Sequence, residues 1–426
     1  MTDTIVVGAG LAGLAAAIRL AQGGHKVSLL TFGLGGLPLG QGSIDLLGYT
    51  HPAGSSHPTA DDQAVADPWA ALPGFIAAHP GHPYALLGTD TIKASLAWLA
   101  ELLPDWLLPS DGVNHLVPTA LGAMRPTLLI QPTMSWPSDA KSVAVIGFQQ
   151  LKDFFPELMA KNLTQTAQVS AKGYLLDLPA RDQEVDSSAL RYANAADHPD
   201  FVSRLAAMIK ATIEPADLIV LPAMLGLASL DPWRSLESTL GTRIVEAHLA
   251  PPSVPGLRLN QALTRLAQAS GVRLIIGSKV IGYEGEGDCL RGVTLHQAGR
   301  DQFYGADQFV YAGGSFESGS LTVDSHGLVH ESLFHLPLVG LGGDRPLIDG
   351  DYWSDQAIFK VGVATNAQLA PINPDGQIVW SNLRVVGGLL PAAVRWTEKS
   401  GDGIAVSSAF AAATDLLNQT SPKKDN

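Results

Sequence analysis

Residues 4–13 read TIVVGAGLAG, an apolar run followed by three closely spaced glycines, and this pattern indicates the fold of the chain. The apolar, β-branched run at residues 4–7 predicts a buried strand. The alanine-rich stretch at residues 14–22 predicts a helix, and the apolar run at residues 26–30 predicts a second strand. Together they predict a βαβ unit with a glycine-rich turn between its first strand and its helix.

Each glycine of this turn has a physical role. Gly8 permits a tight turn, Gly10 lets the backbone approach a phosphate, and Gly13 lets the helix pack on the strand. The helix N-terminus adds free N–H groups and the positive end of a dipole. We therefore expect a nucleotide or flavin to bind here, a purely structural turn being the alternative. The expected contacts are Gly8, Ala9, Gly10, Leu11, Ala12 and Gly13.

Thr31 occupies the position where an Asp or Glu commonly binds the ribose hydroxyls of an adenine dinucleotide. A threonine offers one hydrogen bond and no charge. We therefore do not expect the ribose hydroxyls of an adenosine group to be bound here by a carboxylate in the usual way. A shorter flavin, FMN, would still place its single phosphate at a glycine-lined helix N-terminus.

A second strand, glycine and helix pattern lies near the C-terminus. A predicted strand at residues 382–386 is followed by Gly387 and Gly388, and a helix is predicted at residues 403–417. A second helix N-terminus near the isoalloxazine carbonyl favours flavin over nicotinamide, whereas a plain helix cap is the alternative interpretation. The expected flavin contacts in the second half of the chain are Gly314, Gly387, Gly388, Gly403 and Ile404.

Length and composition limit the class of protein. A chain of 426 residues exceeds one hydrophobic core, so two domains are expected. The net charge of −13 argues against binding nucleic acid. A single cysteine, Cys289, cannot hold an iron–sulfur cluster. We find no stretch of 18 uncharged apolar residues and no signal peptide, so any membrane contact is expected to be indirect.

The pattern of elements predicts an α/β protein, with a Rossmann-like flavin domain of the FAD/NAD(P)-binding type and an inserted α/β cap or substrate domain. Within the insertion we expect a strand at 142–146, a helix at 151–162 and a strand at 217–221. The expected segments are 1–50, 257–320 and 357–420 for the flavin domain, 51–256 for the insertion, 321–356 for a cap or connector and 421–426 for a disordered tail.

Three side chains are candidates for substrate chemistry. Arg258 lies in the first turn of a predicted helix, where a cation opposes the helix dipole unless an anion is also present. Arg125 is a second candidate clamp for a phosphate or carboxylate, and His82 is a candidate general base. A surface arginine and a turn histidine are the ordinary alternatives. The loop histidines His51 and His57 lack ligand spacing, so no metal site is predicted.

Several stretches, in this order along the chain, resemble the B subunits of anaerobic glycerol-3-phosphate dehydrogenases. They are GSIDLL at 42–47, HPYALLG at 82–88, LPA at 221–223, GLA at 226–228, PPSVPGLRL at 251–259, GSF at 314–316 and the residues Phe359, Thr365, Leu369, Pro371 and Asn382. Ser43, in the first of these stretches, is a further expected cofactor contact. Residues 391–400 contain less glycine than the family has there, and Arg395, Trp396 and Lys399 are candidates for a different substrate or acceptor pocket.

The resemblance implies a flavoprotein with FMN that works with a larger FAD-containing A subunit and an Fe–S C subunit at the inner face of the cytoplasmic membrane. It implies oxidation of sn-glycerol 3-phosphate, a small phosphorylated substrate, to dihydroxyacetone phosphate, with electrons passed to quinone in anaerobic respiration. FAD is the alternative cofactor. An electron-transfer module, a flavin-free scaffold and a flavoenzyme for another small hydroxy substrate are also compatible with the sequence.

Overall fold

The computed structural model describes residues 2–50, 63–343, 346–351, 354 and 356–420. The predicted tail 421–426, the histidines His51 and His57, and the predicted domain boundary at residue 51 lie outside these residues. The chain divides into two compact units. Unit 1 contains Met1–Gly36, Asp45–Leu102 and Ala262–Asn426, and unit 2 contains Leu37–Ile44 and Leu103–Gln261.

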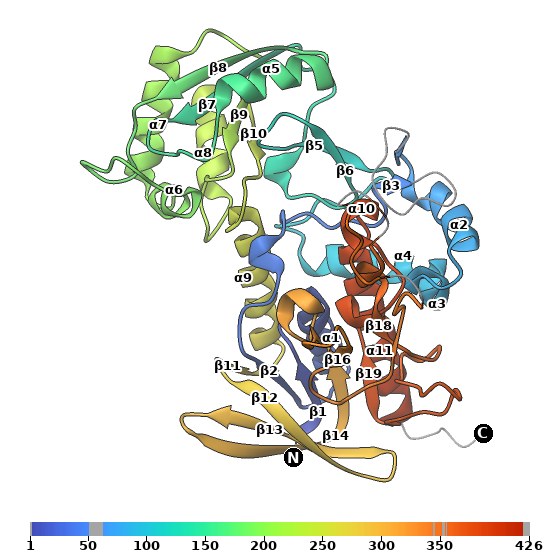
Figure 1. The fold of residues 1–426 in the computed structure, drawn as a ribbon. Coiled ribbons are helices and arrows are strands. Elements are labelled where there is room, and N and C mark those ends of the chain that lie inside the picture. The colour runs from blue at the N-terminus through green and yellow to red at the C-terminus, as the bar shows by residue number, and fades with distance from the viewer. Residues whose placement is uncertain (1, 51–62, 344–345, 352–353, 355, 421–426) are drawn as a thin grey trace, which may run out of the picture. The chain divides into compact units, whose positions relative to one another are not determined.

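A seven-stranded sheet forms the centre of unit 1 (Figure 1). Its strand order is β11-β2-β1-β14-β13-β12, and β19 also pairs with β14. The strands are β1 (Thr2–Val7), β2 (Val27–Thr31), β11 (Arg273–Ile276), β12 (Lys279–Glu286), β13 (Cys289–Gln297), β14 (Arg300–Tyr311) and β19 (Leu383–Val385). The pairs of β1 with β2 and β14, of β2 with β11 and of β14 with β19 are parallel, whereas β13 runs antiparallel to β12 and β14. The predicted βαβ unit is thereby confirmed.

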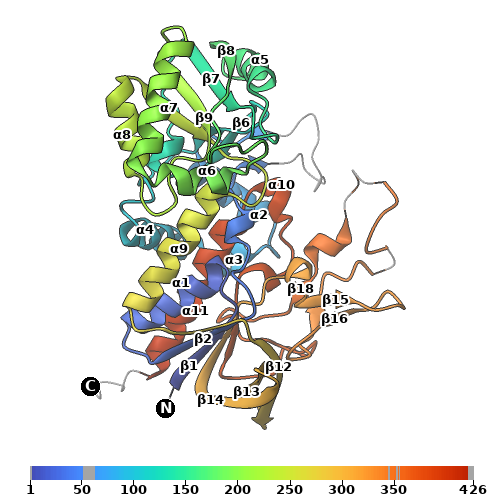
Figure 2. The same ribbon diagram turned by 90° about the vertical axis from the view of Figure 1, so that its left-hand side faces the viewer.

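The parallel part of this sheet is buried, as in β2 and the last residues of β14, whereas β12 and the first residues of β14 are largely exposed. The helices of unit 1 are α1 (Leu11–Gln22), α2 (Pro68–Ala78), α3 (Pro83–Leu87), α4 (Thr89–Leu102), α10 (Arg395–Glu398) and α11 (Gly401–Thr420). α1 and α11 lie side by side (Figure 2). Ile5, Val7 and Phe309 belong to a buried apolar cluster of the same unit. Burial on both faces explains why residues 5–7 of β1 and residues 29–30 of β2 are consecutive apolar residues.

The segment Asp45–Leu102 belongs to unit 1 in the structure, although the sequence predicts the insertion from residue 51. The contacts of α4 with α11 give the physical reason. Ser95 Oγ lies 2.8 Å from Ser407 Oγ, and the rings of Trp98 and Phe410 are 5.6 Å apart. These contacts join residues more than 300 positions apart, so no local pattern reveals them.

Short elements complete unit 1. They are the strands β3 (Tyr49–Thr50), β4 (Gln63–Ala64), β15 (Leu321–Val323), β16 (Val329–Glu331), β17 (Leu338–Val339) and β18 (Gly362–Val363), and the 3-10 helices η3 (Phe316–Ser318), η4 (Ala357–Lys360) and η5 (Gly387–Leu389). The short strands pair as β3 with β4, β15 with β16 and β17 with β18. The predicted connector 321–356 therefore contains paired strands of unit 1 where it is described.

Unit 2 is built on a parallel four-stranded sheet of order β10-β9-β7-β8. Its elements are β7 (Ser142–Phe148), β8 (Ser170–Leu176), β9 (Leu218–Pro222), β10 (Arg243–Ala247), α5 (Pro156–Thr166), α6 (Ala189–Ala196), α7 (Pro199–Thr212), α8 (Asp231–Leu240), the hairpin β5 (His115–Pro118) and β6 (Met124–Thr127), η1 (Leu37–Leu39) and η2 (Pro132–Met134). α9 (Val254–Ala269) spans the boundary between the units.

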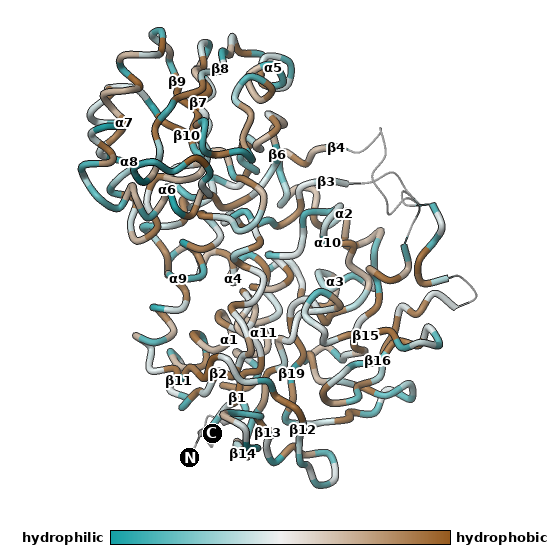
Figure 3. The backbone as a smooth tube through the Cα atoms, turned by 60° about the vertical axis from the view of Figure 1, so that its left-hand side comes forward, coloured by the Kyte–Doolittle hydropathy of each residue, from teal (hydrophilic) through white to brown (hydrophobic). Residues whose placement is uncertain are grey.

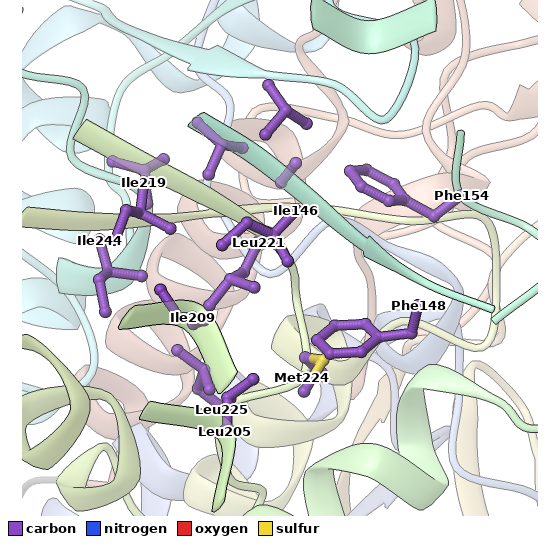
Figure 4. Packing of buried hydrophobic residues seen from close by; sticks show 14 of the residues in the cluster. Ile146, Phe148, Phe154, Leu205, Ile209, Ile219, Leu221, Met224, Leu225 and Ile244 are labelled. Carbon is purple, nitrogen blue, oxygen red and sulfur yellow. The ribbon is translucent and has the colours of Figure 1, made fainter. Parts of the chain in front are cut away.

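The core of unit 2 lies between its sheet and its helices. Ile146 on β7 and Ile219 on β9 pack with Ile209 on α7 (Figure 4). The strands β7 and β9 are accordingly among the hydrophobic segments of the backbone (Figure 3). The strands predicted at 142–146 and 217–221 are confirmed. The helix predicted at 151–162 begins only at Pro156, because a proline fits the first turn of a helix and lacks the N–H that an interior position requires.

Across the described ranges, no helix is both long enough and apolar enough to cross a membrane.

Candidate functional site

The turn between β1 and α1 has the tight geometry that its glycines predict. Gly8 adopts a φ of 105°, a conformation that favours glycine. A Cβ atom on Gly8 would collide with the carbonyl of Ala312, and one on Gly13 would collide with the carbonyl of Gly8. The backbone N–H of Gly8 donates to Leu30 O at 2.8 Å. The first and third glycines are therefore required by the packing of the chain itself.

Gly10 differs from these two glycines. A Cβ atom built on Gly10 meets no protein atom within 4 Å. Gly10 is the N-cap of α1 and contributes no capping side chain, and the first turn of α1 contains no acidic residue. The Cβ direction of Gly10 therefore points into open space, and the first turn of α1 places no negative group there. This is the cradle that a phosphate of a flavin requires, so the residues fit that group.

The loop after β2 closes on this turn, a contact that the sequence does not predict. A Cβ atom on Gly35 would lie 2.6 Å from the amide nitrogen of Gly10 and 2.8 Å from the carbonyl oxygen of Ala9. Gly35 has a φ of 72°. The available signal was the run of glycines at residues 33–42, which is unusually dense for a surface loop.

Thr31 is buried at the end of β2. Its hydroxyl donates a hydrogen bond to the carbonyl of Gly33 at 2.6 Å. The side chain therefore holds the start of the glycine loop and supplies no negative charge. Whether it also contacts a cofactor stays a prediction.

The structure brings the C-terminal glycines next to the N-terminal turn. A Cβ atom on Gly387 would lie 2.9 Å from the Cβ of Ala12, and one on Gly388 would lie 3.0 Å from the carbonyl oxygen of Gly314. The amide of Gly387 donates to the hydroxyl of Ser408 at 2.9 Å. Gly387 therefore lies against the first turn of α1, and Gly388 lies beside Gly314; all three glycines are predicted contacts. Ser408 was missed, because a serine inside an apolar helix has no sequence pattern of its own.

The amides of the two remaining predicted contacts, Gly403 and Ile404, are bonded within the chain, and whether these residues contact a flavin stays a prediction. The amide of Gly403 donates to Asp45 O at 2.7 Å, and the amide of Ile404 donates to Ser400 O at 3.0 Å. A Cβ atom on Gly403 would collide with the hydroxyl of Tyr84, so packing explains this glycine. Neither amide is available to bind a flavin carbonyl in this structure.

His82 is buried and acts as the N-cap of α3. Its Nδ1 accepts a hydrogen bond from the backbone N–H of Tyr84 at 3.1 Å. Its Nε2 lies 3.2 Å from a carboxylate oxygen of Glu398, so the proton resides on Nε2 and is donated to Glu398. With both ring nitrogens engaged, the geometry argues against His82 as the general base and supports the turn-histidine alternative.

Glu398 is the centre of this buried polar cluster. It accepts hydrogen bonds from His82, from Ser400 Oγ at 2.7 Å and from the amide of Val394 at 2.9 Å. Burial by itself raises the pKa of the Glu398 carboxyl, but His82, Ser400 and Val394 outweigh it and hold the pKa below its usual value. Glu398 is therefore a carboxylate at neutral pH, and it fixes the turn between α10 and α11.

The Arg258 side chain is also bonded to other groups of the protein. Its side chain is fully buried in unit 2 and forms an ion pair with Glu246 in which Nη1 and Oε2 are 2.5 Å apart. Its Nε donates to the carbonyl of Gly226 at 2.7 Å. The sequence predicts Arg258 in the first turn of a helix, where a cation is expected to have an anion beside it, and that anion is the Glu246 carboxylate of the same unit. This geometry argues against the prediction that Arg258 clamps an anionic substrate.

The ion pair with Arg258 favours the ionised form of the Glu246 carboxyl group. Burial raises the pKa of the Glu246 carboxyl, but Arg258 and the amide of Leu225 overcome that effect and lower the pKa below its usual value. The amides of Met224 and Leu225 donate to Oε1 of Glu246 at 2.7 and 2.6 Å. The pair therefore ties β10 to the loop after β9 and to α9.

Arg125 and Ser43 are brought together in unit 2. Arg125 lies on β6, and its Nη1 is 3.5 Å from the hydroxyl of Ser43. Both side chains are buried. The neighbouring Gln131 donates from its side-chain amide to the carbonyls of Gly42 and Pro255 at 2.9 and 2.8 Å, which holds the segment that contains Ser43. Their roles in substrate and cofactor binding stay predictions.

Within the described part of the chain, no group of three or more His, Cys, Asp or Glu side chains is arranged to hold a metal ion.

The glycine turn, the N-terminus of α1 and the parallel sheet are typical of nucleotide-binding and flavin-binding proteins. A comparison with protein families identifies the class. The family model described as "FAD binding domain" matches residues 3–404, so this is a flavin-binding α/β protein. The chain is 31% identical to the B subunit of the anaerobic glycerol-3-phosphate dehydrogenase of Yersinia enterocolitica over 98% of both chains. It is 29% identical to the probable B subunit of the same enzyme of Halobacterium salinarum over 97% of both chains. The chain belongs to the family of anaerobic glycerol-3-phosphate dehydrogenase B subunits.

Similar solved structures are more distant. A 3-ketosteroid delta1-dehydrogenase of Sterolibacterium denitrificans is 13% identical, with a TM-score of 0.46 and coverage of 98% of this chain and 99% of that chain. The quinol fumarate reductase of E. coli is 8% identical, with a TM-score of 0.44 and coverage of 100% and 71%. Neither likeness is strong enough to carry an argument about site or substrate.

Proposed function

We propose that this chain is the flavoprotein B subunit of an anaerobic glycerol-3-phosphate dehydrogenase. In this proposal the complex oxidises sn-glycerol 3-phosphate to dihydroxyacetone phosphate and passes the electrons to quinone through partner subunits. The observation that carries the proposal is the N-terminus of α1 at Gly10, with Gly387 against the first turn of α1 and Gly388 beside Gly314. The full-length similarity to named B subunits supplies the substrate.

The flavin is proposed to be FAD. The matching family model describes an FAD binding domain and gives no support to FMN as the cofactor. Thr31, which carries no charge, means that the adenosine ribose would be bound without the usual carboxylate. Bound flavin supplies two-electron redox chemistry. The chain's own residues would hold its phosphates at the amides of Leu11 and Ala12 and would exclude water around the glycine regions.

The partners are proposed to be an FAD-containing A subunit and an Fe–S C subunit. The relatives are named as one subunit of a larger enzyme, and the single cysteine of this chain cannot hold a cluster. Because no described helix can span a bilayer, contact with the inner face of the cytoplasmic membrane would be made through a partner.

If the alcohol is oxidised on this chain, a base must take the hydroxyl proton while the hydride leaves the neighbouring carbon. Arg125 is then the proposed ligand of the substrate phosphate, because its planar guanidinium suits the geometry of a phosphate. Because His82 and Arg258 are bonded within the protein, a second candidate function is favoured. In it the A subunit oxidises the substrate, and this chain transfers electrons through its flavin.

One experiment separates these functions. The purified chain would be denatured by heat and its released flavin identified by chromatography, which distinguishes FAD from FMN. A second sample would receive glycerol 3-phosphate without oxygen while its flavin absorbance is followed. Bleaching places substrate oxidation on this chain, whereas a flavin that stays oxidised favours the electron-transfer function. A chain that binds no flavin, even after reconstitution with FAD or FMN, would refute both in favour of a scaffold.

A further inference from the structure

Arg395 is a cation with a weak partner. It begins the short helix α10, between η5 and α11. Among the described residues its guanidinium has one ion pair, with Glu317 at 3.8 Å. The Glu317 side chain is 69% exposed, whereas that of Arg395 is 25% exposed. Water therefore screens Glu317 more than Arg395. Burial lowers the pKa of the Arg395 guanidinium, and the charges of Glu317 and Glu398 oppose that effect.

The glycines predicted to contact flavin make room for this side chain. A Cβ atom on Gly388 would collide with Nη1 of Arg395, and one on Gly401 would lie 3.5 Å from the arginine Cβ. Gly388 also approaches the carbonyl of Gly314, and the neighbouring Gly387 approaches Ala12 in the first turn of α1. The guanidinium thus lies within the group of backbone segments that forms the candidate flavin site of unit 1.

The site requires a positive charge from some source. Two-electron reduction at neutral pH adds two electrons and one proton to a flavin, which leaves one negative charge on the ring system. A helix N-terminus commonly stabilises that charge. Here the amides of Gly403 and Ile404, at the start of α11, are already bonded to Asp45 and Ser400. The first turn of α11 also contains the acidic residue Asp402, which opposes an added negative charge, so a side-chain cation would add to what this helix supplies.

We propose that Arg395 is the cation that stabilises the reduced, anionic flavin in this chain. The proposal rests on the flavin binding proposed above and adds a residue that sets the reduction potential. Removing the charge should weaken binding of reduced relative to oxidised flavin by about tenfold, which for a two-electron couple corresponds to about 30 mV. Removing the opposing charge of Glu317 should shift the potential the other way, by less.

The test measures the midpoint potential of the flavin bound to the full-length chain, by anaerobic equilibration with reference dyes. Arg395→Gln should lower the potential, Arg395→Lys should stay near the wild-type value, and Glu317→Gln should raise it. Arg291→Gln is the matched control, because it removes one positive charge from an exposed ion pair with Glu286 in the same unit. Its potential should equal that of the wild type.

Two outcomes would overturn the proposal. The first is an Arg395→Gln protein that retains its flavin at the wild-type potential. If that variant does not fold or loses its flavin, Glu317→Gln decides, and an unchanged or lowered potential in it counts against Arg395. A wild-type chain that binds no flavin would instead refute the proposed function itself, together with this inference.

Discussion

Replacing Arg258 with methionine should destabilise unit 2 strongly, because it would leave the Glu246 carboxylate buried without its partner. Both side chains of the pair are fully buried. The change removes the ion pair and the hydrogen bond from Nε to the carbonyl of Gly226. Removing one partner of a buried pair costs about 3–5 kcal/mol. The expected loss is therefore a large part of the stability of an ordinary domain, about 5–15 kcal/mol.

Urea unfolding followed by tryptophan fluorescence would measure this loss. Trp233 is a suitable local reporter, since its indole N–H donates to Ile244 O on β10 at 2.9 Å. Arg243→Gln is the matched control on the same strand, because it breaks an exposed ion pair with Asp139. It should leave the unfolding midpoint almost unchanged. An Arg258→Met protein as stable as the wild type, but with a raised KM for glycerol 3-phosphate, would refute the structural role and restore the substrate clamp.

Further predictions concern the glycine turn and the buried Glu398. Gly13→Ala should misfold or unfold at lower temperature, because its Cβ would collide with the carbonyl of Gly8, whereas Gly10→Ala should fold normally and bind flavin more weakly, since its Cβ meets only open space. Thermal unfolding and flavin titration check this pair, and equal effects of the two substitutions would contradict it. Glu398 has a lowered pKa, so its contribution to stability is complete above its ordinary carboxyl pKa and is lost as the pH falls through the lowered value. Glu398→Gln should therefore make the free energy of unfolding less dependent on pH in that acidic range, as urea unfolding at a series of pH values would show, and an unchanged acid dependence would remove Glu398 as the cause.

Local patterns predicted the strand, glycine turn and helix at the N-terminus of the chain, and the structure contains them. The requirement for Gly13 depends on a contact with Gly8 only five residues away, so the local sequence contains what is needed to predict it. The close approach of Ala312 to Gly8 is made only by the fold. The local sequence also predicts β7 and β9, whose unbroken apolar runs require burial on both faces. The family resemblance was also visible in the order of short motifs, and the full-length similarity confirms it.

The sequence did not reveal which partners the candidate catalytic side chains have. His82 and Arg258 have residue types suited to chemistry, yet their partners Glu398 and Glu246 are brought to them only by folding. His82 and Glu398 are 316 positions apart in the chain. A charged residue becomes a structural pair or a free functional group according to what lies within about 3–4 Å of it, and sequence spacing does not report that distance.

What the sequence alone determined is the βαβ unit, the glycine turn and the family, because each depends on short-range sterics or on patterns preserved along the chain. Only the tertiary structure decided that Asp45–Leu102 belongs with unit 1, that Gly387 meets the first turn of α1, and that Arg395 lies against Gly388 with a weak partner. Those facts depend on contacts between distant segments. Such contacts form because burying apolar surface and satisfying buried polar groups are properties of the whole fold.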